Sequence, residues 1–63
     1  MIDQLARLQS VSASLKDLTD RVTAAADELL AAGDEASATG LYDVERAMRN
    51  ANRRLTRLLA DQG

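Results

Sequence analysis

The segment LAAGDE, residues 30–35, separates two long stretches of helix-forming sequence. Gly33 can take the left-handed backbone conformation that ends a helix, because it has no Cβ to clash with the chain. Asp34 can then accept hydrogen bonds from the free amides that begin another helix. Glu35 places a negative charge in the first turn of that helix, where the helix dipole favours one. The segment therefore predicts a sharp turn at about residues 33–34.

The residues on both sides of this turn repeat with the spacing of packed helices. Apolar side chains recur at alternating steps of three and four, the a/d heptad pattern that keeps one stripe of a helix facing a partner. We therefore expect an all-α fold, an antiparallel two-helix hairpin that forms one unit over residues 1–63, with helices at about 3–32 and 34–61. The heptad residues are Leu8, Val11, Leu15, Leu18, Val22, Ala25 and Leu29 in the first half, and Leu41, Val44, Met48, Ala51, Leu55 and Leu58 in the second.

Two other chain courses fit parts of the sequence. Residues 37–40 could extend the loop, with Thr39 capping a second helix that begins near Gly40. The weak capping-box pattern at residues 14–17 could instead break the first helix after a serine-rich stretch. Short connections dominate between antiparallel helices, and the heptad runs through Ser14 without a slip. The long hairpin with a short turn is therefore the favoured prediction.

The composition removes most kinds of chemical site. The chain has no Cys and no His, so it lacks the commonest zinc ligands and the commonest general base. A two-helix hairpin offers no concave pocket for acid–base catalysis. No apolar run is long enough to cross a membrane, and the first residues lack the features of a signal peptide. We expect a cytoplasmic protein that is not an enzyme, binds no cofactor or metal and does not insert into a membrane.

The short length of the chain favours association. A chain of 63 residues buries a small fraction of its surface and usually needs a disulfide, a metal or a partner to be stable. Two helices packed together leave their core open, and a second hairpin would close it as a four-helix bundle. A helix of another protein would fill the same stripe, but we favour a homodimer. The expected self-association core is Leu8, Val11, Leu15, Leu18, Val22, Leu29, Leu41, Val44, Met48, Leu55 and Leu58.

Arginines dominate the second half of the chain, and no acid lies between Arg46 and Arg57. On the heptad they fall mostly on outer positions. Three interpretations compete: a solvated face paired with Asp43, Glu45 and Asp61, a surface for an acidic protein or for the acidic outer face of another copy, and a nucleic-acid contact. The net charge of −2 and the absence of Phe and Trp make nucleic acid the least favoured. The candidate partner-binding residues are Arg46, Arg49, Arg53, Arg54, Arg57 and Tyr42.

Some polar residues have no single sequence interpretation. Tyr42 is expected either to lie over Leu30 or Ala31 at the turn end of the core or to contact a partner. Asn50 and Asn52 are expected inside a helix although asparagine has a low helix propensity. They are either surface polar residues or part of the same surface as the arginines. The sequence predicts a small non-catalytic interaction or scaffold module that self-associates. The alternatives are an adaptor or regulatory subunit that docks on a larger partner through its arginines, and a weak nucleic-acid-associated protein.

Overall fold

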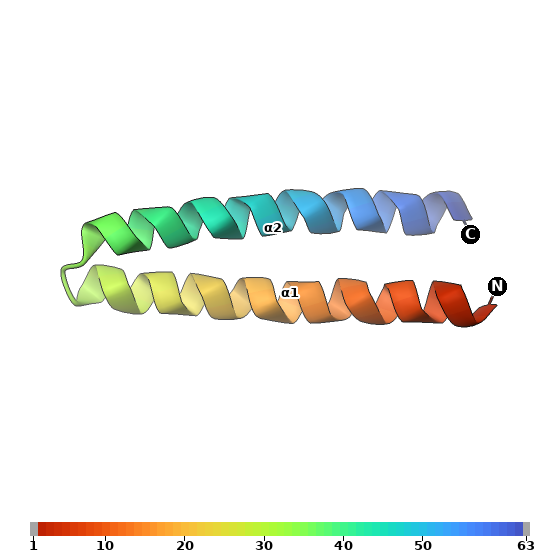
Figure 1. The fold of residues 1–63 in the computed structure, drawn as a ribbon, viewed down its shortest axis with the longest axis horizontal. Coiled ribbons are helices and arrows are strands. Elements are labelled where there is room, and N and C mark those ends of the chain that lie inside the picture. Colours follow the sequence, from red (N-terminus) through yellow and green to blue (C-terminus); the bar gives the residue numbers. More distant parts are fainter. Residues whose placement is uncertain (1, 63) are drawn as a thin grey trace.

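Two antiparallel helices of similar length run side by side and are joined by a short turn (Figure 1). The structure, a computed structural model, describes the backbone of residues 2–62 and the side chains of residues 4–61. Helix α1 spans Ile2–Ala31 and helix α2 spans Glu35–Gln62. The predicted all-α antiparallel hairpin is therefore confirmed, and the first and last residues of the expected unit lie outside the described range.

The turn has the geometry that its sequence predicts. Gly33 has a φ of +89°, in the left-handed region. The amide of Asp34 donates to the carbonyl of Leu29 at 2.9 Å, and that of Gly33 to Leu30 at 3.1 Å, so the last carbonyls of α1 are satisfied. The amide of Ser37 donates to Asp34 Oδ1 at 3.1 Å, which caps α2.

Both alternative chain courses are wrong. The second helix begins at Glu35 rather than near Gly40, because the Asp34 cap already satisfies its free amides. The first helix continues through Ser14 without a break, since the heptad keeps its apolar stripe on one side throughout.

The hairpin is a rod rather than a globule. Its Cα atoms extend over 48 × 15 × 10 Å, with a radius of gyration of 14.5 Å. A compact chain of this length is expected to have a radius of gyration of roughly 11 Å. The turn lies at one end of the rod and the two chain ends lie at the other (Figure 1). Within the described residues, neither helix is apolar over a length sufficient to cross a membrane.

The helices face each other along two parallel lines of residues, of which the heptad predicts only one. The predicted line is half-buried, and we call it the inner line: Leu15, Val22 and Leu29 of α1, with Leu41, Met48 and Leu55 of α2. The second line carries small or polar residues over most of its length, and we call this part the polar seam: Ser12, Thr19 and Ala26 of α1, with Ala38, Glu45 and Asn52 of α2. At the open end of the hairpin the same line continues with Leu5 of α1 and Leu59 of α2, which are half-buried. Its members Ala26, Ala38 and Thr19 are the most buried, at 0, 1 and 3% exposure.

The remaining heptad residues face outward. Val11 and Leu18 of α1 are 52 and 48% exposed, and Val44 and Leu58 of α2 are 46 and 59% exposed. Within the hairpin, the contact between the helices therefore uses only one of the two heptad lines. The physical reason is the size of the polar seam, because alanine and hydroxyl side chains let two helices approach closely where leucines would hold them apart. The place of these residues in a self-association core stays a prediction.

The close approach at Ala26 gives a testable consequence. Ala26→Leu forces extra methyl groups into a contact with no free space, and we expect it to lower the free energy of unfolding by about 1–3 kcal/mol. Ala24→Leu is the matched control, because Ala24 is exposed on the same helix. Urea unfolding followed by circular dichroism at one protein concentration compares them. An equal effect of both substitutions would contradict this packing.

Candidate functional site

The outward heptad residues of the two helices lie on the same face of the hairpin. Two antiparallel helices are related by an approximate twofold axis normal to the plane that contains them, so equivalent heptad positions emerge on the same side. Val11 and Leu18 of α1 therefore share one face with Val44 and Leu58 of α2, beside the half-buried inner line. We call this surface the apolar face. Taken together with the inner line and with Leu8, which is 40% exposed, it includes the positions expected in the self-association core, with Ala25 and Ala51 between them.

The opposite face carries polar contacts between the helices. Ser12 donates from its hydroxyl to Asn52 Oδ1 at 2.8 Å, and Thr23 donates to Glu45 Oε2 at 2.9 Å. Asn52 thus joins the two helices, and it also lies beside the arginines, which was one of its two expected positions. These bonds fix the register of α1 against α2 and hold the polar seam closed.

Nearer the turn, the Tyr42 hydroxyl donates to Asp27 Oδ1 at 2.5 Å. Tyr42 is half-buried and joins α2 to α1 through this bond. The bond gives Tyr42 a contact within the hairpin, and its place among the candidate partner-binding residues stays a prediction. The contact between Tyr42 and Asp27 could not be predicted from the sequence, because it depends on the register of α1 against α2.

Thr19 in the polar seam is tolerated because its own helix satisfies its hydroxyl. Thr19 Oγ1 donates to the carbonyl of Leu15 at 2.6 Å, and Thr23 Oγ1 lies 3.1 Å from the carbonyl of Thr19. The bond from Thr19 to the preceding turn removes the cost of burying its hydroxyl, whereas the hydroxyl hydrogen of Thr23 is donated to Glu45. Among the described side chains, no buried nitrogen or oxygen lacks a hydrogen-bond partner.

The electrostatics of the polar side follow from these bonds. The hydrogen bond from Thr23, reinforced by Arg49, lowers the pKa of Glu45 below its usual 4.5. This carboxylate therefore stabilises the fold above pH 4.5, and the contribution is lost as the pH falls through the lowered pKa. The hydrogen bond to Asp27 raises the pKa of Tyr42 above 10.0, because it favours the protonated phenol.

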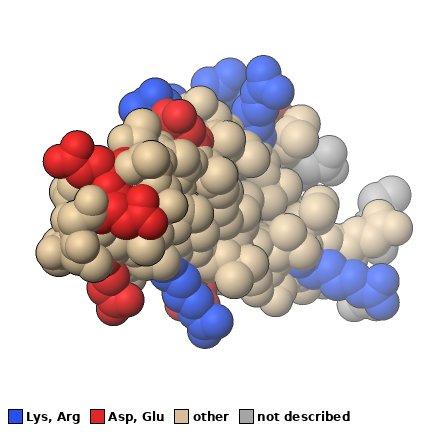
Figure 2. Space-filling view, turned by 60° about the vertical axis from the view of Figure 1, so that its left-hand side comes forward, with Lys and Arg blue, Asp and Glu red and all other residues tan. Residues whose placement is uncertain are grey.

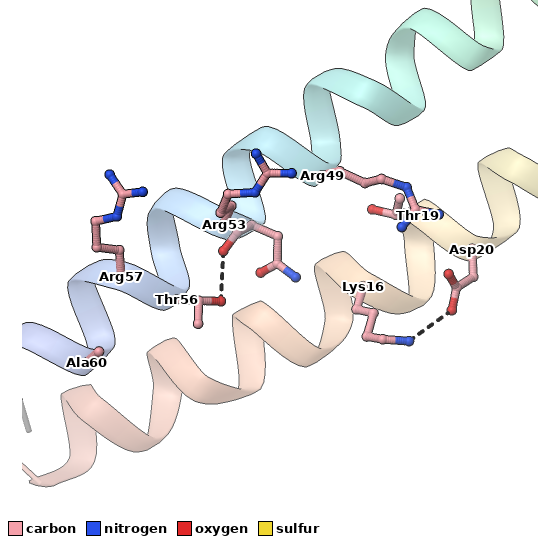
Figure 3. Close-up of a pocket in the computed structure, with 9 residues that line it drawn as sticks. Lys16, Thr19, Asp20, Arg49, Arg53, Thr56, Arg57 and Ala60 are labelled. Atoms are coloured by element: carbon pink, nitrogen blue, oxygen red, sulfur yellow. Dashed lines mark hydrogen bonds and ion pairs between the residues drawn. The ribbon is translucent and has the colours of Figure 1, made fainter.

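A basic groove lies on the polar side toward the open end of the hairpin (Figure 3). Its volume is about 540 Å³. Arg49 extends from α2 toward Thr19 of α1, while Arg53 and Arg57 border the α2 side (Figure 3). The lining residues, which define the basic groove, are Lys16, Thr19, Asp20, Arg49, Asn52, Arg53, Thr56, Arg57 and Ala60.

The cations of the groove differ in how they are neutralised. Lys16 lies 3.4 Å from Asp20, and Arg49 lies 2.8 Å from Glu45. Among the described side chains, no carboxylate comes within ion-pair distance of Arg53 or Arg57. The expected pair between Arg57 and Asp61 is therefore not formed. The groove keeps uncompensated positive charge beside two threonine hydroxyls and an amide.

The arginines predicted as one stripe separate into three settings. Arg49, Arg53 and Arg57 border the groove, together with Lys16, which sequence reasoning did not associate with them. Arg46 pairs with Asp43 at 3.7 Å, as expected for a solvated face. Arg54 lies beside a separate hollow on α2 with Asn50 and Ala51. Lys16 can be placed beside these arginines only when the register of α1 against α2 is known, and the sequence does not give that register.

Comparison with known proteins gives no relative from which a function can be transferred. No family model, no curated protein and no solved structure matches the chain. Across the part of the chain that the structure describes, no three acidic side chains come close enough together to hold a metal ion. The apolar face and the basic groove are the two surfaces of the hairpin that bear on its function.

The contact between Tyr42 and Asp27 predicts the titration of the phenol. Tyr42 is the only tyrosine, so tyrosinate absorbance reports it directly. We expect a midpoint above pH 10.0. The stabilisation from the bond is present below pH 10 and is lost as the pH rises through the raised pKa.

Asp27→Asn removes the carboxylate acceptor, and we expect it to lower the midpoint toward the usual value. Asp20→Asn is the control, because Asp20 lies one heptad earlier on the same line of α1. A midpoint that Asp27→Asn leaves unchanged would contradict the contact.

Proposed function

We propose that the protein is a non-catalytic interaction or scaffold module that self-associates through its apolar face into a four-helix bundle. The observation that carries the proposal is the collection of exposed aliphatic residues of both helices on one side of the hairpin. A monomer gains nothing from Val11, Leu18, Val44 and Leu58 in that position, because each is about half exposed there. A partner that covers them would bury aliphatic surface worth about 1.5–3 kcal/mol for each large side chain.

The hairpin exposes more surface than a compact protein of its mass, and the excess is about the area that one interface of a dimer would cover. Its accessible surface is 4863 Å². A compact protein of this mass is expected to expose roughly 4,000 Å², so the hairpin exposes about 900 Å² in excess. A standard specific interface buries about 800 Å² on each partner. One interface on the apolar face therefore brings each copy to the exposure of a compact protein.

A second copy fits this face for geometric reasons. The apolar face is a shallow stripe that runs along both helices, and an identical stripe is complementary to it under a twofold axis. Four antiparallel helices around a closed core are the common solution for hairpins of this kind. The hydrogen bonds of the polar seam and the basic groove remain on the outside of such a bundle.

The proposal predicts the effect of one charge on the apolar face. Leu18→Glu removes a leucine and adds a carboxylate in both copies. Losing about 1.5 kcal/mol at each of two sites raises the dissociation constant of the dimer at least a hundredfold. Light scattering after size exclusion, over a hundredfold range of protein concentration, measures the change.

Ala13→Glu is the matched control, because Ala13 is exposed on the outer side of α1 and the added charge is the same. It should leave the dissociation constant nearly unchanged. A wild-type protein that is a folded monomer at every concentration would overturn the proposal. So would an equal loss of association in both variants.

A second candidate function is the docking of an acidic protein segment in the basic groove. The specific observation in its favour is the uncompensated charge of Arg53 and Arg57 beside Thr56 and Thr19. Arg49, Arg53 and Arg57 are spaced four residues apart, about 6 Å per step along α2. Carboxylates at the same spacing on a partner helix would meet all three. A long nucleic acid fits less well, because the turn end of the rod is acidic and the chain offers no stacking platform of Phe or Trp.

This candidate is tested with a synthetic helical peptide that carries glutamates at every fourth position, compared with a scrambled peptide of the same composition. We expect the ordered peptide to bind more tightly. Arg53→Glu with Arg57→Glu should weaken its binding at least tenfold, since two charge-assisted contacts are lost. Calorimetric titration at low ionic strength measures both affinities.

The control is Arg21→Glu with Arg46→Glu, which changes the net charge equally outside the groove. Equal affinity for both peptides, or equal loss in both double variants, would remove this candidate. Tighter binding of a short DNA duplex than of the peptide would favour a nucleic-acid role instead.

A further inference from the structure

The charges of the hairpin are divided between its two ends. Residues 17–48, which make the half with the turn, contain eight acidic and two basic side chains, a formal charge of −6. Residues 1–16 and 49–63 make the open half, with two acidic and six basic side chains, a formal charge of +4. Figure 2 shows acidic side chains gathered about the turn end, with basic side chains mostly further along the rod. The rod is therefore a charge dipole along its length.

The dividing line between the halves lies at one level on both helices. The hydrogen bond from Ser12 to Asn52 lies on the open side of this line, and that from Thr23 to Glu45 lies on the turn side. Lys16 of α1 and Arg49 of α2 are bracketed by these bonds and both line the basic groove. The charge therefore changes sign at the middle of the rod on α1 and α2 together.

Two copies can join their apolar faces in two ways. In one, both turns lie at the same end, and α1 of each copy packs on α2 of the other. In the second, the turns lie at opposite ends, and each helix packs on its own counterpart, antiparallel. Aliphatic packing admits both arrangements. For example, Leu15 meets Ala51 of the second copy in the first and Leu18 of the second copy in the other.

The charges separate these arrangements. With both turns at the same end, the two acidic halves lie against each other, as do the two basic halves. With the turns at opposite ends, each acidic half lies against a basic half. The flanks of the bundle are within about 10 Å of one another, which is the range over which charges still interact at moderate ionic strength. Like charges side by side also act against the wrong assembly.

We infer that two copies assemble with their turns at opposite ends, so that the acidic half of one hairpin covers the basic half of the other. This inference rests on the proposed self-association and adds its orientation. The twofold axis then passes near Lys16 and Asp17 of α1. At the edge of the apolar face it brings Arg7 of one copy within about one helical turn of Glu28 of the second copy.

Spin labels on single cysteines test the orientation, because the natural chain has no Cys. Ala31→Cys places a label beside the turn, and Asp17→Cys places one near the middle of the rod. Both positions lie on one heptad line of the exposed side of α1, so their distances between copies differ only along the rod. Electron–electron double resonance of each dimer, in full-length protein, measures the distance between the two labels.

With the turns at opposite ends, the labels at residue 31 are separated by roughly 40 Å along the rod, while those at residue 17 are nearly level. We therefore expect a long distance at residue 31 and a short one at residue 17. Equal short distances at both residues would show a dimer with its turns together and would overturn the orientation. The absence of any dipolar signal at residue 17 would show instead that the apolar faces do not join, which is failure of the proposed function.

The salt dependence of the dissociation constant provides an independent check. Attraction between opposite halves is screened by salt, so the dimer should dissociate more readily at 0.5 M than at 0.05 M NaCl. A dimer that tightens with salt would indicate repulsion between like halves and contradict the orientation.

Discussion

The close contact along the polar seam is the constraint on which the rest of the structure depends. Ala26 and Ala38 allow α1 and α2 to approach near the turn, and the bond from Ser12 to Asn52 fixes the register further along. Larger side chains on this line would rotate the helices about their axes and bring Val11 and Leu18 inward. Because the small residues occupy the contact, the aliphatic residues are turned to one face. The face available to a second copy is thus a consequence of how the hairpin closes.

The polar seam also explains how polar residues occupy the closest contact at little cost. Thr19 donates to a carbonyl of its own helix, and Thr23 bonds to Glu45 across the hairpin. On folding, each hydroxyl exchanges its hydrogen bond to water for one to a fixed acceptor in the protein, so burial leaves no unpaired polar group. A hairpin closed by such contacts has a defined register but a thin hydrophobic core. The proposed cover of the apolar face by a second copy would add stability to such a hairpin and would link folding to assembly.

The turn and both helices follow from the sequence because their signals are local. Gly33 and Asp34 act on the neighbouring amides and carbonyls, and a heptad records which side of a helix is apolar. The contact between the helices does not follow in the same way. Alanine, serine and threonine on the polar seam look in the sequence like a solvated line. Contacts between distant residues, such as the pairing of Ser12 with Asn52 across forty residues, distinguish them. The basic groove could not be predicted from the sequence for the same reason, because the register of the two helices is what places Lys16 beside Arg49.

The most direct test of assembly through the apolar face is an isotope-filtered nuclear Overhauser experiment on mixed dimers of labelled and unlabelled protein. It detects only contacts between copies. The account predicts cross-peaks between copies from the methyl groups of Val11, Leu18, Val44 and Leu58, and none from the methyl groups of Thr19 or Thr56. Cross-peaks that arise from the threonine side, or their absence from the apolar face in a confirmed dimer, would contradict it.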